Sequence, residues 1–433
     1  MSDKLFADLS PGDPPEAAPA EPRYETANRA QVELYPCDLE ALLPPDHAAR
    51  LVWRFVEGLQ LEAFYAAIAA REGHPGRPAI DPKILLALWL YATIDGVGSA
   101  REVDRLCQHH DAYRWIRGGV PVNYHTLSDF RVAHQAALDD LLTQSIAALV
   151  HRGVVTLARV AHDGTRVRAS AGVKSFRRRP RLAECLRVAR HQVERTARQP
   201  EGGATSRQAA AQARAARDRL ARVEAALEEL PAVEAAKARK KSKVAPRVST
   251  TDPDARVMKM TDGGFRPAYN VQLATDVDGR AIVGVGVSQV GSDQGELVPM
   301  LDQIAERAGR VPAAEVVDGG FATRAAITTA AARGVTIYAP VAKPKGDRAP
   351  GVPCKGDSAA VAAWRARMAT EEGRRIYKAR AATAEWINAD TRTHRTLGHV
   401  LLRGVGKVHC WVLWVALAQN MMRTMDIIPH LMT

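Results

Sequence analysis

Residues 174–247 interrupt a series of β-strand patterns with a long helical segment that carries all of the chain's excess positive charge. This segment contains 20 Lys or Arg and 8 Asp or Glu, whereas the rest of the 433-residue chain has 40 of each. Apolar residues repeat at helical spacing on both sides of the polar stretch QPEGGATS, at Leu182, Leu186, Ala189 and Val193 and again at Leu220, Val223, Leu227 and Leu230. The pattern predicts an antiparallel helical hairpin inserted into a domain that contains β-strands.

The sequence on either side of this insertion predicts one mixed α/β domain, formed by residues 156–173 and 248–433. A strand precedes the insertion, and PAYNVQLATDVDG and RAIVGVGVSQVG follow it as two strands joined by Asp-Gly, which is typical of a hairpin. Further along, SDQGELVPMLDQIAERAGR, TRAAITTAAARG and RRIYKARAATAEWINADTRT predict helices, and AAEVVDGG and VTIYAPV predict the strands between them. Asp293 is expected to cap the first of these helices.

The N-terminal part predicts a helical domain over residues 31–155, after a disordered tail at residues 1–30 that is rich in Pro, Ala and Glu. DPKILLALWLYATIDG is apolar on all sides and predicts a buried helix. Several short helices joined by Gly and Asn turns suit a helix-turn-helix-like DNA-binding module, and a plain helical bundle is the alternative. The expected reading helix lies around residues 126–134, where Tyr124, Ser128 and Arg131 would be available to a duplex.

The charge balance favours a polyanionic partner. The net charge is +12 and the isoelectric point is near 9.6, which suits nucleic acid or an anionic membrane. Within the insertion we expect Arg177, Arg178, Arg179 and Arg181 to contact the DNA backbone; the alternatives are a solvated charged face or a dimerising coiled coil. The five cysteines form no C-x-x-C pair, and no signal peptide or membrane-spanning run is evident, so we expect a cytosolic protein.

Two acids stand at predicted strand ends, Asp163 in VAHDGT and Asp318 in EVVDGG. A lone Asp there is most often a turn residue, because a buried carboxylate is costly unless it is paired or binds a metal. If the two strands are adjacent and parallel, both carboxylates project at the same edge of the sheet, where open α/β sheets place their sites. If they do not converge, Asp276 or Asp293 would be the alternative partner of Asp163.

A third acid is expected from the last helix of this domain, at Glu385. Tyr377, Glu385 and Arg392 lie within about 80° of one another on a helical wheel, and Arg380 flanks their face. Surface charge alternation is the alternative. Three carboxylates suit a pair of Mg²⁺ ions that promote phosphodiester chemistry, with Mn²⁺ as a substitute. Arg380 and Arg392 would neutralise phosphate charge nearby.

Several motifs together resemble the bacterial insertion-sequence DDE transposases. HDGTRVRA, GFRPAYNVQLATD, GSDQGELVPM, VVDGGFA and YKARAATAEWINADTR resemble their ribonuclease H-like domain, and GRPAIDPKILLALWLYA and NYHTLSDFR resemble their InsH-type N-terminal domain. The resemblance runs from about residue 35 to the end of the chain and includes a closing helix in LRGVGKVHCWVLWVALAQNMMR. It implies a mixed sheet with helices on both faces.

By this resemblance Asp163, Asp318 and Glu385 are the acidic triad and metal ligands. Tyr377, Arg380, Glu385 and Arg392 take the positions of the family's Tyr-Arg-Glu-Lys signature. The implied chemistry is hydrolysis at the ends of the element, followed by attack of the freed 3′ hydroxyl on target DNA. The implied partners are double-stranded DNA and a second copy of the chain when DNA is bound.

Two other function classes remain open from the sequence. One is a non-catalytic DNA-binding protein derived from a transposase, although three converging acids serve no purpose in a protein that only binds. The other is an unrelated nuclease of the same fold, which the N-terminal module and the closing helix disfavour.

Overall fold

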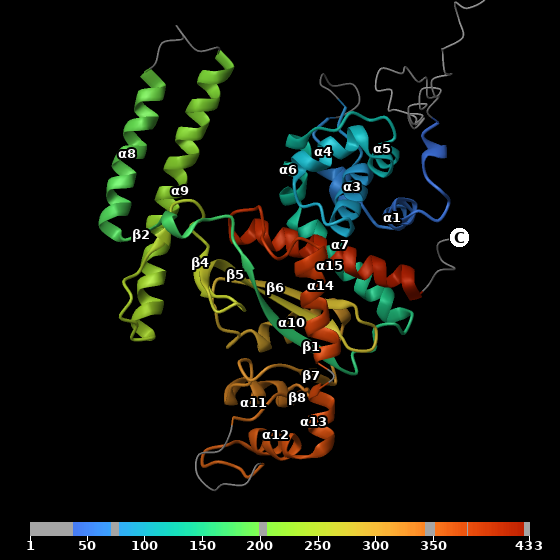
Figure 1. The fold of residues 1–433 in the computed structure, drawn as a ribbon. Helices are drawn as coiled ribbons and strands as arrows, with labels where there is room; N and C mark the ends of the chain where they lie inside the picture. The colour runs from blue at the N-terminus through green and yellow to red at the C-terminus, as the bar shows by residue number, and fades with distance from the viewer. Residues whose placement is uncertain (1–37, 71–77, 199–205, 343–350, 379, 428–433) are drawn as a thin grey trace, which may run out of the picture. The chain divides into compact units, whose positions relative to one another are not determined.

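The structure is a computed structural model that describes residues 38–70, 78–198, 206–342, 351–378 and 380–427 (Figure 1). The predicted tail at residues 1–30 lies outside these ranges. Within them, no helix is long and apolar enough to cross a membrane.

The N-terminal part is helical, as predicted. Its elements are the 3₁₀ turn Glu40–Leu42 and the helices α1 (Ala48–Glu57), α2 (Glu62–Ala66), α3 (Pro82–Ile94), α4 (Ala100–His109), α5 (Asp111–Arg117), α6 (Tyr124–Ala133) and α7 (Gln135–His151). The predicted buried helix is α3, which starts at a cap formed by the Asp81 side chain and is almost entirely buried. The closing helix α15 (Val405–Ile427) packs on α3 and α7, and the Trp414 indole donates a hydrogen bond to the Arg131 carbonyl at 3.0 Å.

One mixed sheet forms the centre of the second part of the chain. Its strands are β1 (Val160–Arg168), β4 (Arg256–Lys259), β5 (Phe265–Asp276), β6 (Ile282–Ser288), β7 (Ala314–Val316) and β8 (Thr336–Tyr338). The order β6-β5-β1-β7-β8 has antiparallel β6/β5 and β5/β1 pairs and parallel β1/β7 and β7/β8 pairs, and β4 extends the outer edge of β5. This is the ribonuclease H-like arrangement.

Helices lie on both faces of this sheet. They are α10 (Leu297–Ala308), α11 (Arg324–Ala332), α12 (Ala359–Ala369), α13 (Glu371–Lys378), a π-helical turn (Ala381–Glu385) and α14 (Trp386–His394). On one face, Gly284 of β6 leaves room for Met300 of α10. On the other, Asn388 of α14 reaches Asp163 of β1. His162 and Asp163 therefore point to opposite faces, because side chains alternate along a strand.

The insertion is a helical hairpin formed by α8 (Arg179–Arg198) and α9 (Ser206–Arg239), which run side by side (Figure 1). Arg179 pairs with Glu234, and Arg190, further along α8, pairs with Glu224, which comes earlier in α9. The two helices therefore run antiparallel, as predicted. Short strands β2 (Phe176–Arg177) and β3 (Val248–Ser249) pair where the chain enters and leaves the hairpin.

The apolar stripes predicted in the hairpin pack mainly against each other. Leu182 of α8 is fully buried in one cluster with Ala226, Leu230 and Val233 of α9 and with Val248 of β3. These side chains are therefore buried against one another within one chain, whereas Leu186, Val193 and Leu220 are half-buried.

Candidate active site

Asp163 lies in the middle of β1, not at its end as predicted. The nine residues of β1 all pair with β5, whereas only Val160 and Ala161 pair with β7. Asp163 therefore lies just past the point where the parallel pairing with β7 stops. Asp163 thus lies at the end of the β1/β7 pairing, although β1 itself continues to Arg168 beside β5.

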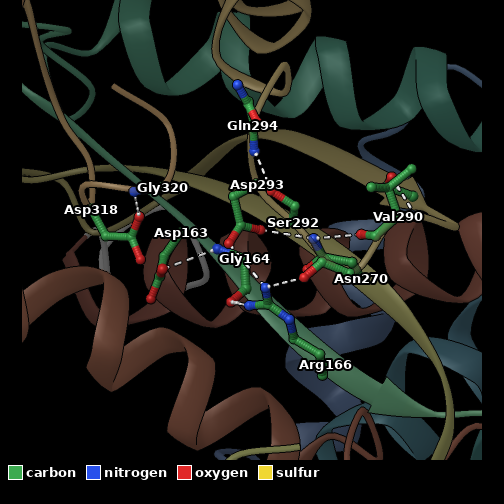
Figure 2. A network of polar contacts seen from close by, with 12 residues as sticks. Asp163, Gly164, Arg166, Asn270, Val290, Ser292, Asp293, Gln294, Asp318 and Gly320 are labelled. Carbon is green, nitrogen blue, oxygen red and sulfur yellow. Dashed lines mark hydrogen bonds and ion pairs between the residues drawn. The ribbon is translucent and has the colours of Figure 1, made fainter. Parts of the chain in front are cut away.

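Asp318 follows β7 at the same level. Ala161 is opposite Val316 in the β1/β7 pair, and each acid comes two residues after its member of that pair. The two strands are parallel neighbours, which is the condition under which the two carboxylates were expected to share an edge. Neighbouring strands are about 4.8 Å apart. Figure 2 shows the side chains of Asp163 and Asp318 next to one another. The Gly320 amide donates a 2.5 Å hydrogen bond to Asp318 Oδ1, so the Asp-Gly-Gly turn holds this carboxyl group.

Glu385 is carried by a helix that is not continuous, which corrects the single helix expected there. Between α13 and α14 the chain makes one π-helical turn, in which the Glu385 amide reaches back five residues to the Arg380 carbonyl at 3.5 Å. The extra residue in this turn changes the phase between Tyr377 and Arg392, so a helical wheel does not describe their faces. Such turns occur often at functional sites.

Arg380 links the strand acid to the helix acid. Its Nη1 lies 3.1 Å from Asp163 Oδ1, and its Nη2 lies 3.1 Å from Glu385 Oε1. The same guanidinium lies 5.9 Å from the centre of the Tyr377 ring, a cation–π distance. One planar cation thus lies between two of the three predicted acids and next to Tyr377, the first residue of the signature.

Comparisons with known proteins agree with this arrangement. A transposase domain, DUF772, matches residues 37–133, and a transposase DDE domain matches residues 354–425, which include Glu385 and its helix. Together the two matches support an insertion-sequence DDE transposase. Comparison with curated proteins and with solved structures gives no match.

The electrostatics of this candidate site follow from its burial and its charges. Burial raises the pKa of Asp163; Arg380 opposes this effect, and the charges of Asp318 and Asp293 add to it. Burial would lower the pKa of Arg380, but Asp163 and the other nearby acids bring that pKa above its usual value. The acids therefore interact as one group, and Arg380 is their counter-ion.

Transposases of the DDE family generally use divalent metal ions, and the donor set here is chemically suitable. Carboxylate oxygens are the ligands that Mg²⁺ and Mn²⁺ prefer. As the chain stands, no three His, Cys, Asp or Glu side chains in its described part are gathered closely enough to bind a metal ion. Arg380 lies between Asp163 and Glu385 and pairs with both. A buried oxygen without a partner, Asn388 Oδ1, lies on the residue that contacts Asp163.

A fourth acid, Asp293, has a structural role and is not the helix cap that was expected. Helix α10 starts only at Leu297, after Glu296. Asp293 Oδ1 accepts a hydrogen bond from Asn270 at 2.7 Å, and Oδ2 accepts one from Arg166 at 3.1 Å (Figure 2). Oδ1 also accepts a hydrogen bond from Gln272 at 2.9 Å. Burial alone would raise the pKa of Asp293, but these partners hold that pKa below its usual value.

The Asp293 network continues as a buried chain on the face of β1 opposite Asp163. His162 Nε2 lies 3.0 Å from Gln272 Oε1, and His162 Nδ1 lies 3.1 Å from Glu315 Oε1. These bonds join β7, β1 and β5 on either side of Asp163. Because a slip of one residue would turn Asp163 to the wrong face, this chain fixes the register that the site needs. In the sequence, the only sign of this buried chain is that His162 and Gly164 stand on either side of Asp163.

Asp276, the other alternative partner of Asp163, lies at the far end of β5. It is opposite Val160 in the β1/β5 pair, and its Oδ2 accepts a hydrogen bond from the Thr156 amide at 3.3 Å. Asp276 is therefore separate from the acids that Arg380 links. Arg392 lies two helical turns beyond Glu385, and within the described ranges it is paired with no acid.

The expected reading helix is α6, but one of its three proposed DNA contacts is buried. Tyr124 and Ser128 are half-buried. Arg131 is only 6% exposed, lies between the rings of Trp89 at 4.7 Å and Trp411 at 5.6 Å, and donates to the Gly98 carbonyl. Burial lowers the pKa of Arg131 to about 10. The prediction that Arg131 is available to a duplex is wrong, because α15 covers it.

The four arginines proposed at the start of the hairpin differ in their surroundings. Arg178, Arg179 and Arg181 are exposed, and Arg177 is half-buried and donates to backbone carbonyls. Arg179 makes a two-bond contact with Glu234 at 3.2 and 2.8 Å, and Arg181 pairs with Glu184. Exposed pairs of this kind contribute little to stability, so they do not prevent contact with phosphate.

Proposed function

We propose that this transposase cuts DNA at the ends of its element and joins the freed 3′ end to target DNA, with two Mg²⁺ ions bound by Asp163, Asp318 and Glu385. The observation that carries the proposal is the shared level of Asp163 and Asp318 on parallel strands, together with the Arg380 bridge to Glu385. Mn²⁺ is the expected substitute, since its ligand preferences are similar.

The bound ions would supply Lewis acidity, which activates the attacking oxygen and stabilises the leaving oxygen of the phosphodiester. The chain's own residues set up this chemistry. Arg380 compensates the acids before the site is loaded and, once released from them, can pair with a phosphate of the DNA strand. Tyr377 supports the Arg380 guanidinium from its ring face. We assign Arg392, further along α14, to the DNA backbone.

We assign DNA recognition to the helical domain at residues 31–155, with Tyr124 and Ser128 of α6 directed to the element ends. The hairpin at residues 174–247 would add affinity without reading sequence, through backbone contacts of Arg177, Arg178, Arg179 and Arg181. Residues 156–173 and 248–433 are then the catalytic domain. A homodimer on DNA would bring two such sites to the two ends of one element.

The salt dependence of DNA binding tests the role of the hairpin. Replacement of the four arginines with Ala should weaken binding to specific and random duplexes alike. Each lost phosphate contact lowers the salt slope by about 0.9. An unchanged slope would exclude the hairpin as a phosphate-binding arm.

The competing function is DNA binding without catalysis. A labelled duplex that carries the DNA flanking the gene on either side separates the two functions. The purified protein should cut this duplex with Mg²⁺ or Mn²⁺ and not with EDTA, and it should yield strand-transfer products when target DNA is added. Binding without any cutting in either metal would favour the non-catalytic protein. Cutting without strand transfer would indicate a nuclease of the same fold.

A further inference from the structure

Asn388 lies on α14 three residues after Glu385 and reaches the strand acid. Its Nδ2 donates a hydrogen bond to Asp163 Oδ2 at 3.0 Å, and the residue is 8% exposed. Residues three apart share a helix face, so Glu385 and Asn388 lie on the same side of the helix. Asn388 carries no signal in the sequence, because an Asn inside a helix has no distinctive pattern.

The two oxygens of Asp163 have different partners. Oδ1 accepts a hydrogen bond from the Gly164 amide at 3.0 Å and pairs with Arg380 at 3.1 Å. Oδ2 has Asn388 as its one donor among the residues that the structure describes. The orientation of the Asn388 amide follows from charge, because the reverse orientation would place its oxygen against a carboxylate oxygen.

The other end of the Asn388 amide has no partner among the residues described. Its Oδ1 is buried and accepts no hydrogen bond within the described part of the chain. Nearly all buried polar atoms in proteins have a hydrogen-bond partner. Asn388 Oδ1, next to a proposed metal ligand, is therefore expected to accept a hydrogen bond from a bound group. A hydrated divalent cation brings bound waters, which are strong donors, into this part of the site.

We propose that Asn388 is a positioning residue that orients the Asp163 carboxylate from the helix that carries Glu385, and that its unpaired oxygen is satisfied when a hydrated divalent cation binds. This inference rests on the proposed function. Asn388 couples the strand acid to the helix acid while Arg380 is displaced, so that Asp163 keeps its orientation when its counter-ion leaves.

The test measures metal binding by the full-length protein without DNA and then metal-dependent cutting. Asn388→Leu removes both polar ends of the side chain at similar volume. We expect it to weaken Mn²⁺ binding in a calorimetric titration by about 10- to 100-fold, the effect usual for partners that orient metal ligands. The Mn²⁺ concentration for half-maximal cutting should rise by the same factor, while duplex affinity in EDTA stays unchanged.

Asn388→Asp guards against a variant that fails to fold, since it has the same shape. It places a second carboxylate against Asp163 Oδ2 and removes the donor. The melting temperature of Asn388→Asp in EDTA should be lower than that of the wild type. Addition of Mn²⁺ should raise the melting temperature of the variant by more than that of the wild type. An Asn388→Asp protein whose response to Mn²⁺ equals that of the wild type would contradict the proposal.

Asn420→Leu is the matched control. Asn420 is also a buried Asn, but it joins α15 to Ile282 of β6, at 2.7 and 2.9 Å. It should lower stability without changing the Mn²⁺ titration. If the wild type binds Mn²⁺ and cuts DNA while Asn388→Leu titrates identically, the inference is wrong and the proposed function remains. If the wild type neither binds Mn²⁺ nor cuts, both are wrong.

Discussion

Gly164 is the position where one added methyl group should disturb the site most. A Cβ atom there would lie 2.2 Å from Asp293 Oδ1 and 2.7 Å from Gln272 Nε2, whereas ordinary contacts begin near 3.4 Å. Asp293 cannot retreat freely, because it is held by hydrogen bonds from Asn270, Gln272 and Arg166. The absence of a side chain at Gly164 therefore leaves the space that the Asp293 carboxylate occupies, on the face of β1 opposite Asp163.

Gly164→Ala should require a shift of about 1 Å between β1 and Asp293, which for overpacking costs about 1–3 kcal/mol of unfolding free energy. The shift also displaces Asp163, the next residue, and a misplacement of about 1 Å can lower a catalysed rate about 100-fold. Urea unfolding gives the stability, and cutting of the flanking-DNA duplex at saturating Mn²⁺ gives the rate. Duplex binding should be unaffected.

Two controls make the result decisive. Gly172, shortly after the same strand, has open space around its Cβ position and φ −88°, so Gly172→Ala should be neutral or slightly stabilising. If the clash with Asp293 is the cause, Gly164→Ala should cost much less in an Asp293→Ala background. An equal cost in both backgrounds, or a Gly164→Ala protein with wild-type stability and rate, would show that contact with Asp293 does not constrain this position.

Three further predictions concern charged groups. Burial raises the pKa of Asp276 to about 6, with the Thr156 amide opposing it, so the folded chain keeps a proton that the unfolded chain loses above about pH 4. Stability therefore falls as the pH rises from about 4 to 6, and Asp276→Asn should gain up to about 3 kcal/mol at pH 8 and nothing at pH 4, by urea unfolding. Arg131→Ala should cost about 2–3 kcal/mol through lost packing and leave the salt slope of DNA binding unchanged; a lower slope would restore Arg131 as a phosphate contact. Arg380→Met should lower the melting temperature in EDTA, because the acids lose their counter-ion, and Mn²⁺ should raise the melting temperature of this variant by more than that of the wild type. Equal melting curves would show that the pairing of Arg380 with Asp163 and Glu385 is unimportant.

Much of the fold follows from the sequence because its signals are local. The change from helical to strand periodicity located the sheet, and the Asp-Gly turn located the β5/β6 hairpin. Asp163 and Asp318 were placed together because parallel neighbouring strands bring equivalent positions to one edge, which the β1/β7 register confirms. The antiparallel insertion followed from two apolar stripes separated by a polar stretch.

The errors arose where distant segments decide the outcome. Ser292 and Asp293 before a helical run look like a cap, but Asn270 and Gln272 on a separate strand take the Asp293 carboxylate. Arg131 looks exposed by its local spacing, but Trp411, far along the chain, covers it. The π-helical turn before Glu385 has no sequence signature, so the helical wheel was applied across a break in phase.

The most direct test of the account is strand cutting by Asp318→Asn, measured beside DNA binding on the same flanking-DNA duplex. The substitution removes one negative charge from the group formed by Asp163, Asp318 and Glu385 and leaves α6 and the hairpin untouched. We predict that cutting in Mg²⁺ or Mn²⁺ falls to background while duplex affinity stays close to that of the wild type. A folded Asp318→Asn protein that cuts at the wild-type rate, or that loses binding and cutting equally, would contradict the assignment of these acids as the catalytic centre.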